Sequence, residues 1–400
     1  MGSMTLSGGF IFDGTGNAPF RADVRVEDGR IAEIGADLES DESVDATGRT
    51  ILPGLIDCHS HVAFADMPGP EEAVSRTATY SALRAIAGLH ATLAAGVTTV
   101  RDAAGADGGL RRAIEEGLIP GPRLLVSLMQ LSPSAGPYDA RTPSGLDLWI
   151  DRPGIPRPVA DGVDGVRAKV REFVQAGADV IKIFATGNFA MPRGGARRQL
   201  FRDDELSAIV DEAGAHGVRV MAHAHGAAGA AAAARAGVAS IEHGLFLDEA
   251  ALDVMVERRT VFVPTLLASA GGMEGAATEE EAERMRSVVQ GHRAVVREAH
   301  RRGVTIAMGS DCPATAHGRN LEELSLLTDC GLTAREALLA ATSTAAQLLG
   351  LEEEIGTVER GKRADLVVVA GDALEIATLA QRIDMVFRDG ARVLPIKEAR

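Results

Sequence analysis

The chain has 400 residues, of which 46% are hydrophobic and 24% charged, the usual composition of a globular protein. Its formal net charge of −15 argues against nucleic acid or an anionic membrane as a partner, and no apolar run approaches the ~18 residues that a membrane span needs. We expect its partners to be a small-molecule substrate and, in a homo-oligomer, further copies of the same chain.

The first residues have neither the basic region nor the apolar region of a signal peptide. The three cysteines, Cys58, Cys312 and Cys330, lie far apart and form no Cys-x-x-Cys pair. This pattern favours a reducing compartment and argues against a zinc site built on thiolates. We therefore expect a cytoplasmic protein, in which Cys58 and Cys312 are small buried core residues.

The first 50 residues have the pattern of short strands joined by turns. Valines alternate across 24–26, and an Asp-Gly pair at 28–29 precedes a further apolar stretch, which is typical of a β-hairpin. Strand-like segments return near the end of the chain. Because neither end is long enough to bury a core alone, we predict that residues 1–53 and 355–400 form one composite β-sandwich.

Between these ends, strand-like runs alternate with helical stretches. The strand-like runs lie at 98–102, 123–127, 179–184, 219–223, 240–243, 261–265 and 305–311, after an opening strand that leads into His59. The helical stretches lie at 71–95, 161–177, 203–217, 226–237, 248–258, 279–302 and 333–349. Eight strands that alternate with helices predict a (β/α)8 TIM barrel over residues 54–354.

Potential metal ligands stand at the ends of several predicted strands. The first strand ends in His59-Ser60-His61, and residues i and i+2 of a strand face the same side. Further histidines and a carboxylate end other strands: His223 and His225, His243, and Asp311. Neutral imidazole is the commonest metal ligand, although a lone His-x-His is also compatible with two polar residues on a solvated face. Strand ends meet at one face of a barrel, so the set predicts a metal site.

Lys182 lies within an apolar strand, between Ile181 and Ile183. An ammonium is costly to bury among such residues. The alternative is a lysine that points outward and keeps its charged end in water.

These motifs together resemble the amidohydrolase superfamily of metal-dependent hydrolases, above all its prolidase-like and imidazolonepropionase-like branch. The resemblance spans nearly the whole chain and is carried by the segments 54–61, 177–187, 222–226, 240–244, 309–311 and 361–366. It implies a site for two Zn²⁺ per chain. The implied ligands are His59, His61 and Asp311 for one ion, His223 and His243 for the other, and N6-carboxylated Lys182 as the bridge between them.

The resemblance also implies a mechanism. Two cations lower the pKa of a bridging water, so that a bridging hydroxide attacks, and they polarise the scissile carbonyl. Asp311 takes the proton of the water and passes it to the leaving nitrogen. We expect cleavage of the C–N bond of a small carboxylate-bearing substrate, such as a dipeptide or an N-acyl amino acid. The alternatives are a cyclic amide hydrolase, a metal-dependent decarboxylase or isomerase, and a silent binding barrel, which the complete ligand set disfavours.

The loops around the predicted site depart from the family pattern. The loop after the third strand lacks a histidine that relatives carry, and the next segment is long and Pro-rich. Long loops of this kind form pocket walls, although their side chains can equally hold the loop itself together. The predicted substrate contacts are Tyr138, Arg141, Trp149, Arg193, His225 and His317. Arg193, with Arg197 and Arg198, would suit a carboxylate, or would be a solvated basic loop. His225 is alternatively a structural, hydrogen-bonded histidine.

Overall fold

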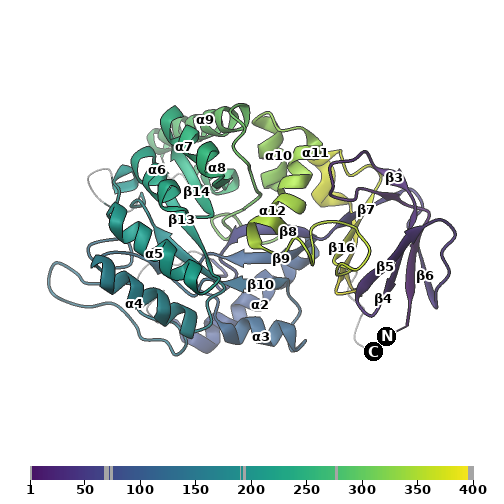
Figure 1. Cartoon of the computed structure of the whole chain (residues 1–400), viewed down its shortest axis with the longest axis horizontal. Helices are drawn as coiled ribbons and strands as arrows, with labels where there is room; N and C mark the ends of the chain where they lie inside the picture. Colours follow the sequence, from purple (N-terminus) through teal and green to yellow (C-terminus); the bar gives the residue numbers. More distant parts are fainter. Residues whose placement is uncertain are drawn as a thin grey trace.

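The fold, known here from a computed structural model, combines parallel strands and helices with an additional all-β region (Figure 1). The structure describes residues 2–66, 72, 75–189, 191, 195–274 and 278–394. Within these residues, no helix is long and apolar enough to cross a membrane.

Strands from both ends of the chain form two sheets at one side of the molecule (Figure 1). The four-stranded sheet has the order β5 (Arg30–Gly35), β4 (Asp23–Glu27), β1 (Met4–Ser7), β6 (Glu42–Asp45). The six-stranded sheet has the order β18 (Ala391–Leu394), β17 (Ile383–Arg388), β16 (Leu366–Ala370), β7 (Arg49–Pro53), β2 (Phe10–Ile11), β3 (Phe20–Arg21). The two chain ends are thus joined by the antiparallel pairing of β16 with β7.

One buried apolar cluster fills the space between these two sheets. Leu6 and Val24 come from the first sheet, and Ile51, Leu366 and Phe387 come from the second. The predicted hairpin is confirmed as β4–β5, where Asp28 and Gly29 adopt φ values of +49° and +76°, as a tight hairpin turn requires. The strands of the two chain ends therefore share one core, while the predicted domain boundaries stay a prediction.

The remaining strands form two parallel sheets. The three-stranded sheet has the order β10 (Arg123–Val126), β9 (Val97–Asp102), β8 (Leu55–Ser60). The five-stranded sheet has the order β11 (Gln130–Leu131), β12 (Val180–Phe184), β13 (Arg219–Gly226), β14 (Ser240–Phe246), β15 (Val261–Val263). In β9 and β12 the side chains are buried on both faces, which explains why these sequence runs are largely apolar.

The segment 305–311, predicted as a strand, is less regular than expected. It forms only an isolated bridge between Ile306 and Phe262 of β15. The ladder is interrupted because the Met308 N–H donates to the carbonyl of Ala340 at 2.8 Å, outside the sheet. On its other side, the Cys58 N–H of β8 donates to the Met308 carbonyl at 2.9 Å. The segment therefore connects β15 with β8 through backbone hydrogen bonds.

Helices follow most of the parallel strands. Their bounds are α2 (Ala78–Ala94), α3 (Gly108–Glu115), α4 (Gly162–Gln175), α5 (Asp203–Ala215), α6 (Ala227–Ala236), α7 (Glu249–Arg258), α8 (Leu266–Glu274), α9 (Glu279–Arg301), α10 (Glu322–Asp329), α11 (Ala334–Ala340) and α12 (Ser343–Leu349), with 3₁₀ turns η1 (Gly195–Arg197) and η2 (Ile376–Arg382). The helix predicted at 333–349 is two helices, because Thr342 has a non-helical φ of −131° and ψ of −101°. The short helices α3, α8 and α10 were not predicted.

Candidate metal centre and its cavity

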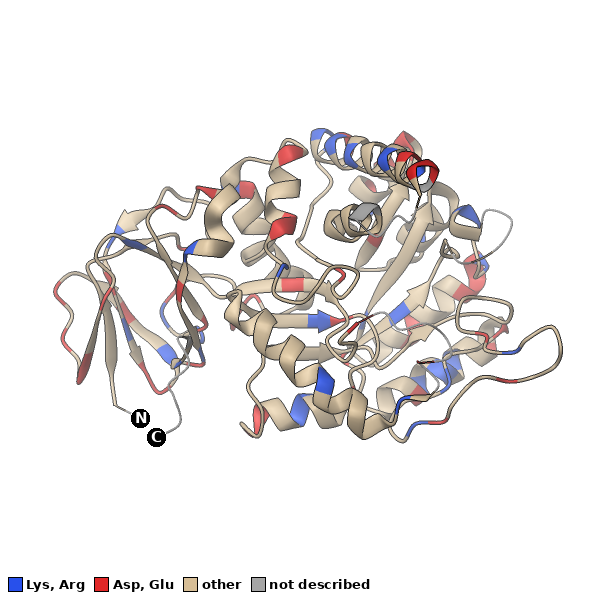
Figure 2. Ribbon diagram, turned by 180° about the vertical axis from the view of Figure 1, so that it is seen from behind, with Lys and Arg blue, Asp and Glu red and all other residues tan. Residues whose placement is uncertain are grey.

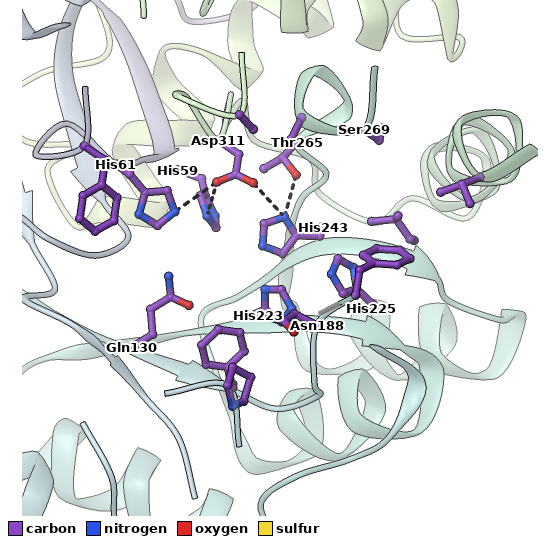
Figure 3. A pocket seen from close by; sticks show the side chains of 18 of the residues that line it. His59, His61, Gln130, Asn188, His223, His225, His243, Thr265, Ser269 and Asp311 are labelled. Carbon is purple, nitrogen blue, oxygen red and sulfur yellow. Dashed lines mark hydrogen bonds and ion pairs between the residues drawn. The ribbon is translucent and has the colours of Figure 1, made fainter. Parts of the chain in front are cut away.

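Polar side chains from the ends of β8, β11, β13 and β14 and from the segment that leads to Asp311 converge on one cavity (Figure 3). The cavity has a volume of about 660 Å³. Seven of the predicted site residues line it: His59, His61, Tyr138, His223, His225, His243 and Asp311. Parallel strands end at the same edge of a sheet, so residues far apart in the chain, such as His59 and His243, meet here.

His59, His61 and Asp311 form the closest group of possible ligands. One donor atom from each lies within 4.8 Å of the others. Asp311 Oδ1 is 3.2 Å from His61 Nε2 and 3.4 Å from His59 Nε2. Asp311 also has a φ of +56°, a left-handed conformation that non-glycine residues adopt at some cost and that is found most often at functional sites. The group is therefore shaped to hold a cation.

His223 and His243 lie beside this group. Their ring centroids are 4.5 Å apart, and the His243 ring is 4.7 Å from that of His59. The Nδ1 atom of His243 is 2.8 Å from Thr265 Oγ1. Burial lowers the pKa of both His223 and His243 well below the usual value. Both rings are therefore neutral, and this is the form in which imidazole binds a metal.

Lys182 points inward, toward the same group. Its side chain is fully buried in β12, and its Nζ atom is 3.4 Å from His59 Nε2. Burial lowers the pKa of Lys182 to about 8. The uncharged amine is therefore much more abundant near neutral pH than in an exposed lysine. The alternative of a lysine that points outward is wrong, because the side chain is fully buried.

A buried ion pair supports His59 from behind. His59 Nδ1 is 2.6 Å from Glu242 Oε2, and Arg101 Nη2 is 3.0 Å from Glu242 Oε1. Burial raises the pKa of Glu242, but Arg101 and His59 outweigh it and bring that pKa to about 2. The hydrogen bond between His59 Nδ1 and the Glu242 carboxylate orients the ring so that Nε2 faces Asp311 and Lys182.

The sequence reasoning did not identify this pair. Arg101 and Glu242 are 141 residues apart, and each stands in an apolar strand. The only indication in the sequence was the presence of a charged residue in each apolar strand, because such a residue needs a partner when it is buried.

Asp57 connects the two segments that carry the first ligand group. Its fully buried carboxylate accepts hydrogen bonds from Ser310 Oγ at 2.6 Å and from Asn320 Nδ2 at 2.8 Å. It also accepts one from the His59 N–H at 3.0 Å. Asp57 thus fixes β8 against the segment that ends in Asp311.

The remaining predicted substrate residues lie in different places. His225 is buried in the cavity wall, and its Nδ1 atom has no hydrogen-bond partner among the described residues. Arg141 forms an ion pair with Asp139 at 2.8 Å, and Trp149 Nε1 donates to Asp151 at 2.9 Å. His317 Nε2 is 2.9 Å from the carbonyl oxygen of Phe64. Arg141, Trp149 and His317 are not part of the described cavity lining, and their role in substrate binding stays a prediction.

The predicted arginine cluster is also divided. Arg193 lies outside the described residues. The guanidinium of Arg197 stacks on the Phe246 ring, 3.7 Å from its centroid. Arg198 lines a different cavity, beside Ser134 and Asp161. Neither Arg197 nor Arg198 belongs to the described lining of the metal cavity.

Other residues that line the cavity were not predicted. Gln130 comes from β11, where it pairs in register with Lys182. Arg284, Met285 and Val288 come from the long helix α9. Sequence periodicity predicts this helix, but only its packing decides which of its residues reach the cavity.

Comparison with known proteins identifies the family. Residues 50–393 match the amidohydrolase family. The chain belongs to this family. It is 32% identical to ochratoxinase of Aspergillus niger over 394 residues, which cover 92% of this chain and 81% of that protein. This amidohydrolase is a hydrolase that acts on carbon–nitrogen bonds.

Two solved structures of similar enzymes match almost the entire chain. A Xaa-Pro dipeptidase with methionine bound in its active site is 31% identical, with a TM-score of 0.87, and the match covers 98% of this chain and 99% of that one. A prolidase in complex with N-methylphosphonate-L-proline is 34% identical, with a TM-score of 0.87 and the same coverage.

Proposed function

We propose that this amidohydrolase is a binuclear zinc enzyme that cleaves the amide bond of a dipeptide or an N-acyl amino acid. The observation that carries the proposal is the convergence of two donor groups on one cavity, with buried Lys182 beside them. The similar dipeptidase binds methionine and the similar prolidase binds a proline derivative, so amino acids are the preferred component of the substrate.

We also propose that the two parallel sheets close into a (β/α)8 barrel, beside a composite β-sandwich. Three observations support closure. β10 and β11 are separated by only three residues. The Phe262 N–H of β15 donates to the Thr305 carbonyl at 2.8 Å, and the Asp311 N–H donates to the His59 carbonyl at 2.7 Å. The strand ends would then surround the cavity, as in other barrel enzymes.

The residues present fit zinc. Imidazole nitrogen and carboxylate oxygen are its usual protein ligands in catalytic sites, and burial keeps the imidazoles of His223 and His243 neutral. One ion would be held by His59, His61 and Asp311. The other would be held by His223 and His243, and a carboxylated Lys182 would bind both ions. Bound zinc would supply a water of lowered pKa and would polarise the scissile carbonyl.

The chain's own residues would move the proton and orient the ligands. Although burial opposes it, the neighbouring His59 and His61 hold the pKa of Asp311 well below its usual range, so that this side chain is an available acceptor. Asp311 would accept the proton of the attacking water and return it to the leaving nitrogen. Lys182 with a pKa of about 8 has the uncharged amine that carboxylation by CO₂ requires.

Metal analysis and product analysis test this proposal together. Protein purified without chelators is expected to contain two zinc ions per chain by elemental analysis. It is then incubated with dipeptides, N-acyl amino acids and cyclic amides, and the products are identified by mass spectrometry. A chain without zinc would contradict the metal assignment. A chain that carries zinc but releases no amine from any acyclic amide would contradict the substrate assignment.

A further inference from the structure

One part of the cavity wall is mainly apolar. Leu245, Ala268, Met285 and Val288 line it, with Phe189 half exposed at its edge. Met285 and Val288 come from α9, the long helix along which basic residues recur in Figure 2. Such a wall suits an aliphatic or aromatic side chain of a ligand.

One charged side chain stands beside this wall. Arg284 lines the cavity, and among the described lining residues it is the only arginine or lysine. Arg284 and Val288 are four positions apart, so they lie on the same face of α9. A ligand that packs against Val288 therefore passes close to the guanidinium.

Arg284 has no partner in the described part of the chain, which distinguishes it from its neighbour Arg286. The guanidinium of Arg286 forms ion pairs with Glu279 at 2.5 Å and with Glu283 at 2.7 Å. Arg284 makes no ion pair or hydrogen bond with another described residue. The only carboxylate in the described lining is that of Asp311, and it lies against His59 and His61. The anion that would complement Arg284 is therefore absent from the described lining.

We propose that Arg284 binds the carboxylate of the amino acid whose nitrogen belongs to the scissile amide. The side chain of that amino acid packs against Leu245, Met285 and Val288. A guanidinium can bind a carboxylate through two parallel hydrogen bonds, which also fix its orientation. The assignment rests on the proposed function, and it names the substrate class as N-acyl derivatives of apolar amino acids with a free carboxylate. It places the carboxylate beside α9, while the carboxylate site predicted at Arg193, which lies outside the described residues, stays a prediction.

A pair of substrates and a pair of variants test this assignment in the full-length zinc-loaded enzyme. The substrates are N-benzoyl-L-leucine and N-benzoyl-L-leucinamide, which differ only in the carboxylate, and released benzoate is measured by chromatography. The variants are Arg284→Met and Arg286→Met. Arg286 is two positions along the helix and hence on another face, so its variant controls for the loss of one positive charge from α9.

We expect Arg284→Met to lower kcat/KM for N-benzoyl-L-leucine by about tenfold to a hundredfold, mainly through KM, because a charge-assisted hydrogen bond is lost. The same variant should leave the leucinamide within about twofold, and Arg286→Met should leave both substrates within about twofold. The assignment is wrong if Arg284→Met changes both substrates equally or neither.

Failure of the proposed function gives a different result. In that case the wild-type enzyme releases benzoate from neither substrate. Calorimetric titration with N-benzoyl-L-leucine then decides the assignment: weaker binding to Arg284→Met than to wild type and to Arg286→Met supports it, and equal binding overturns it.

Discussion

The two regions of this amidohydrolase use their strands in opposite ways. Between the terminal sheets, Leu6, Val368 and Phe387 pack in a wholly apolar cluster, while charged pairs such as Arg25–Glu33, 3.0 Å apart, stay at the surface. In contrast, the parallel strands bury Arg101, Lys182 and Glu242 almost completely. Buried charge lowers stability unless it is paired, so the second arrangement is expected where chemistry requires it. Buried charge thus gathers around the cavity, apart from pairs such as Asp365 with Arg123, and apolar packing dominates the supporting region between the terminal sheets.

The largest expected effect is on turnover. Asp311→Asn should lower kcat by about a thousandfold, because the amide cannot accept and return a proton. The other proposed ligands, which include His59, His61, His223 and His243, should still retain part of the zinc. Steady-state kinetics and elemental analysis on the same sample test this. A wild-type kcat at full zinc occupancy would show that Asp311 is not the proton carrier.

The next effect concerns stability alone. Leu366→Ala should lower the free energy of unfolding by about 2–5 kcal/mol, because Leu366 is fully buried between the terminal sheets and the change leaves a cavity. Zinc affinity should stay within about twofold, since the change lies in the supporting region. Urea unfolding and zinc titration of the apoprotein measure the two quantities, and Leu366→Ile, which conserves volume, is the matched control. An equally large loss of zinc affinity would remove the distinction between the two regions.

The smallest of the three effects concerns the ion pair behind His59. Glu242→Gln keeps the shape but removes the charge that orients His59, so zinc affinity should fall by about tenfold to a hundredfold. Competition with a chelator of known affinity measures this, and Glu33→Gln at the exposed Arg25 pair is the control. An unchanged affinity would mean that β8 alone orients His59.

Much of this architecture could be predicted from local patterns. Strand-like runs and helical stretches in the sequence indicated the parallel strands and the longer helices, since both depend on neighbouring residues. Gly237, for example, ends α6 with a φ of +97°. The split at Thr342 was missed, because the helical periodicity continues through it. The irregular segment 305–311 was missed for a related reason, because its hydrogen bond to Ala340 depends on a distant helix.

The residues proposed to contact the substrate were the hardest to predict from the sequence. Aromatic and basic residues in long loops suggested Arg141 and Trp149, but each forms a contact with an aspartate two positions away. These aspartates are visible in the sequence and favour the alternative that Arg141 and Trp149 hold their own loop together. Arg284 gave no comparable signal, because an exposed arginine on a charged helix looks the same whether or not it faces a cavity.

The sequence by itself determined the order of the longer helices and of most of the parallel strands, because both follow from the periodicity of neighbouring side chains. It also placed a histidine, lysine or aspartate in five of those strands. Only the tertiary structure decided which strand ends meet and that Arg101 and Glu242 lie behind His59. It also decided that α9 forms part of the cavity wall and brings Arg284 to it. Such contacts join residues far apart in the chain, and they depend on how sheets and helices pack rather than on any local pattern.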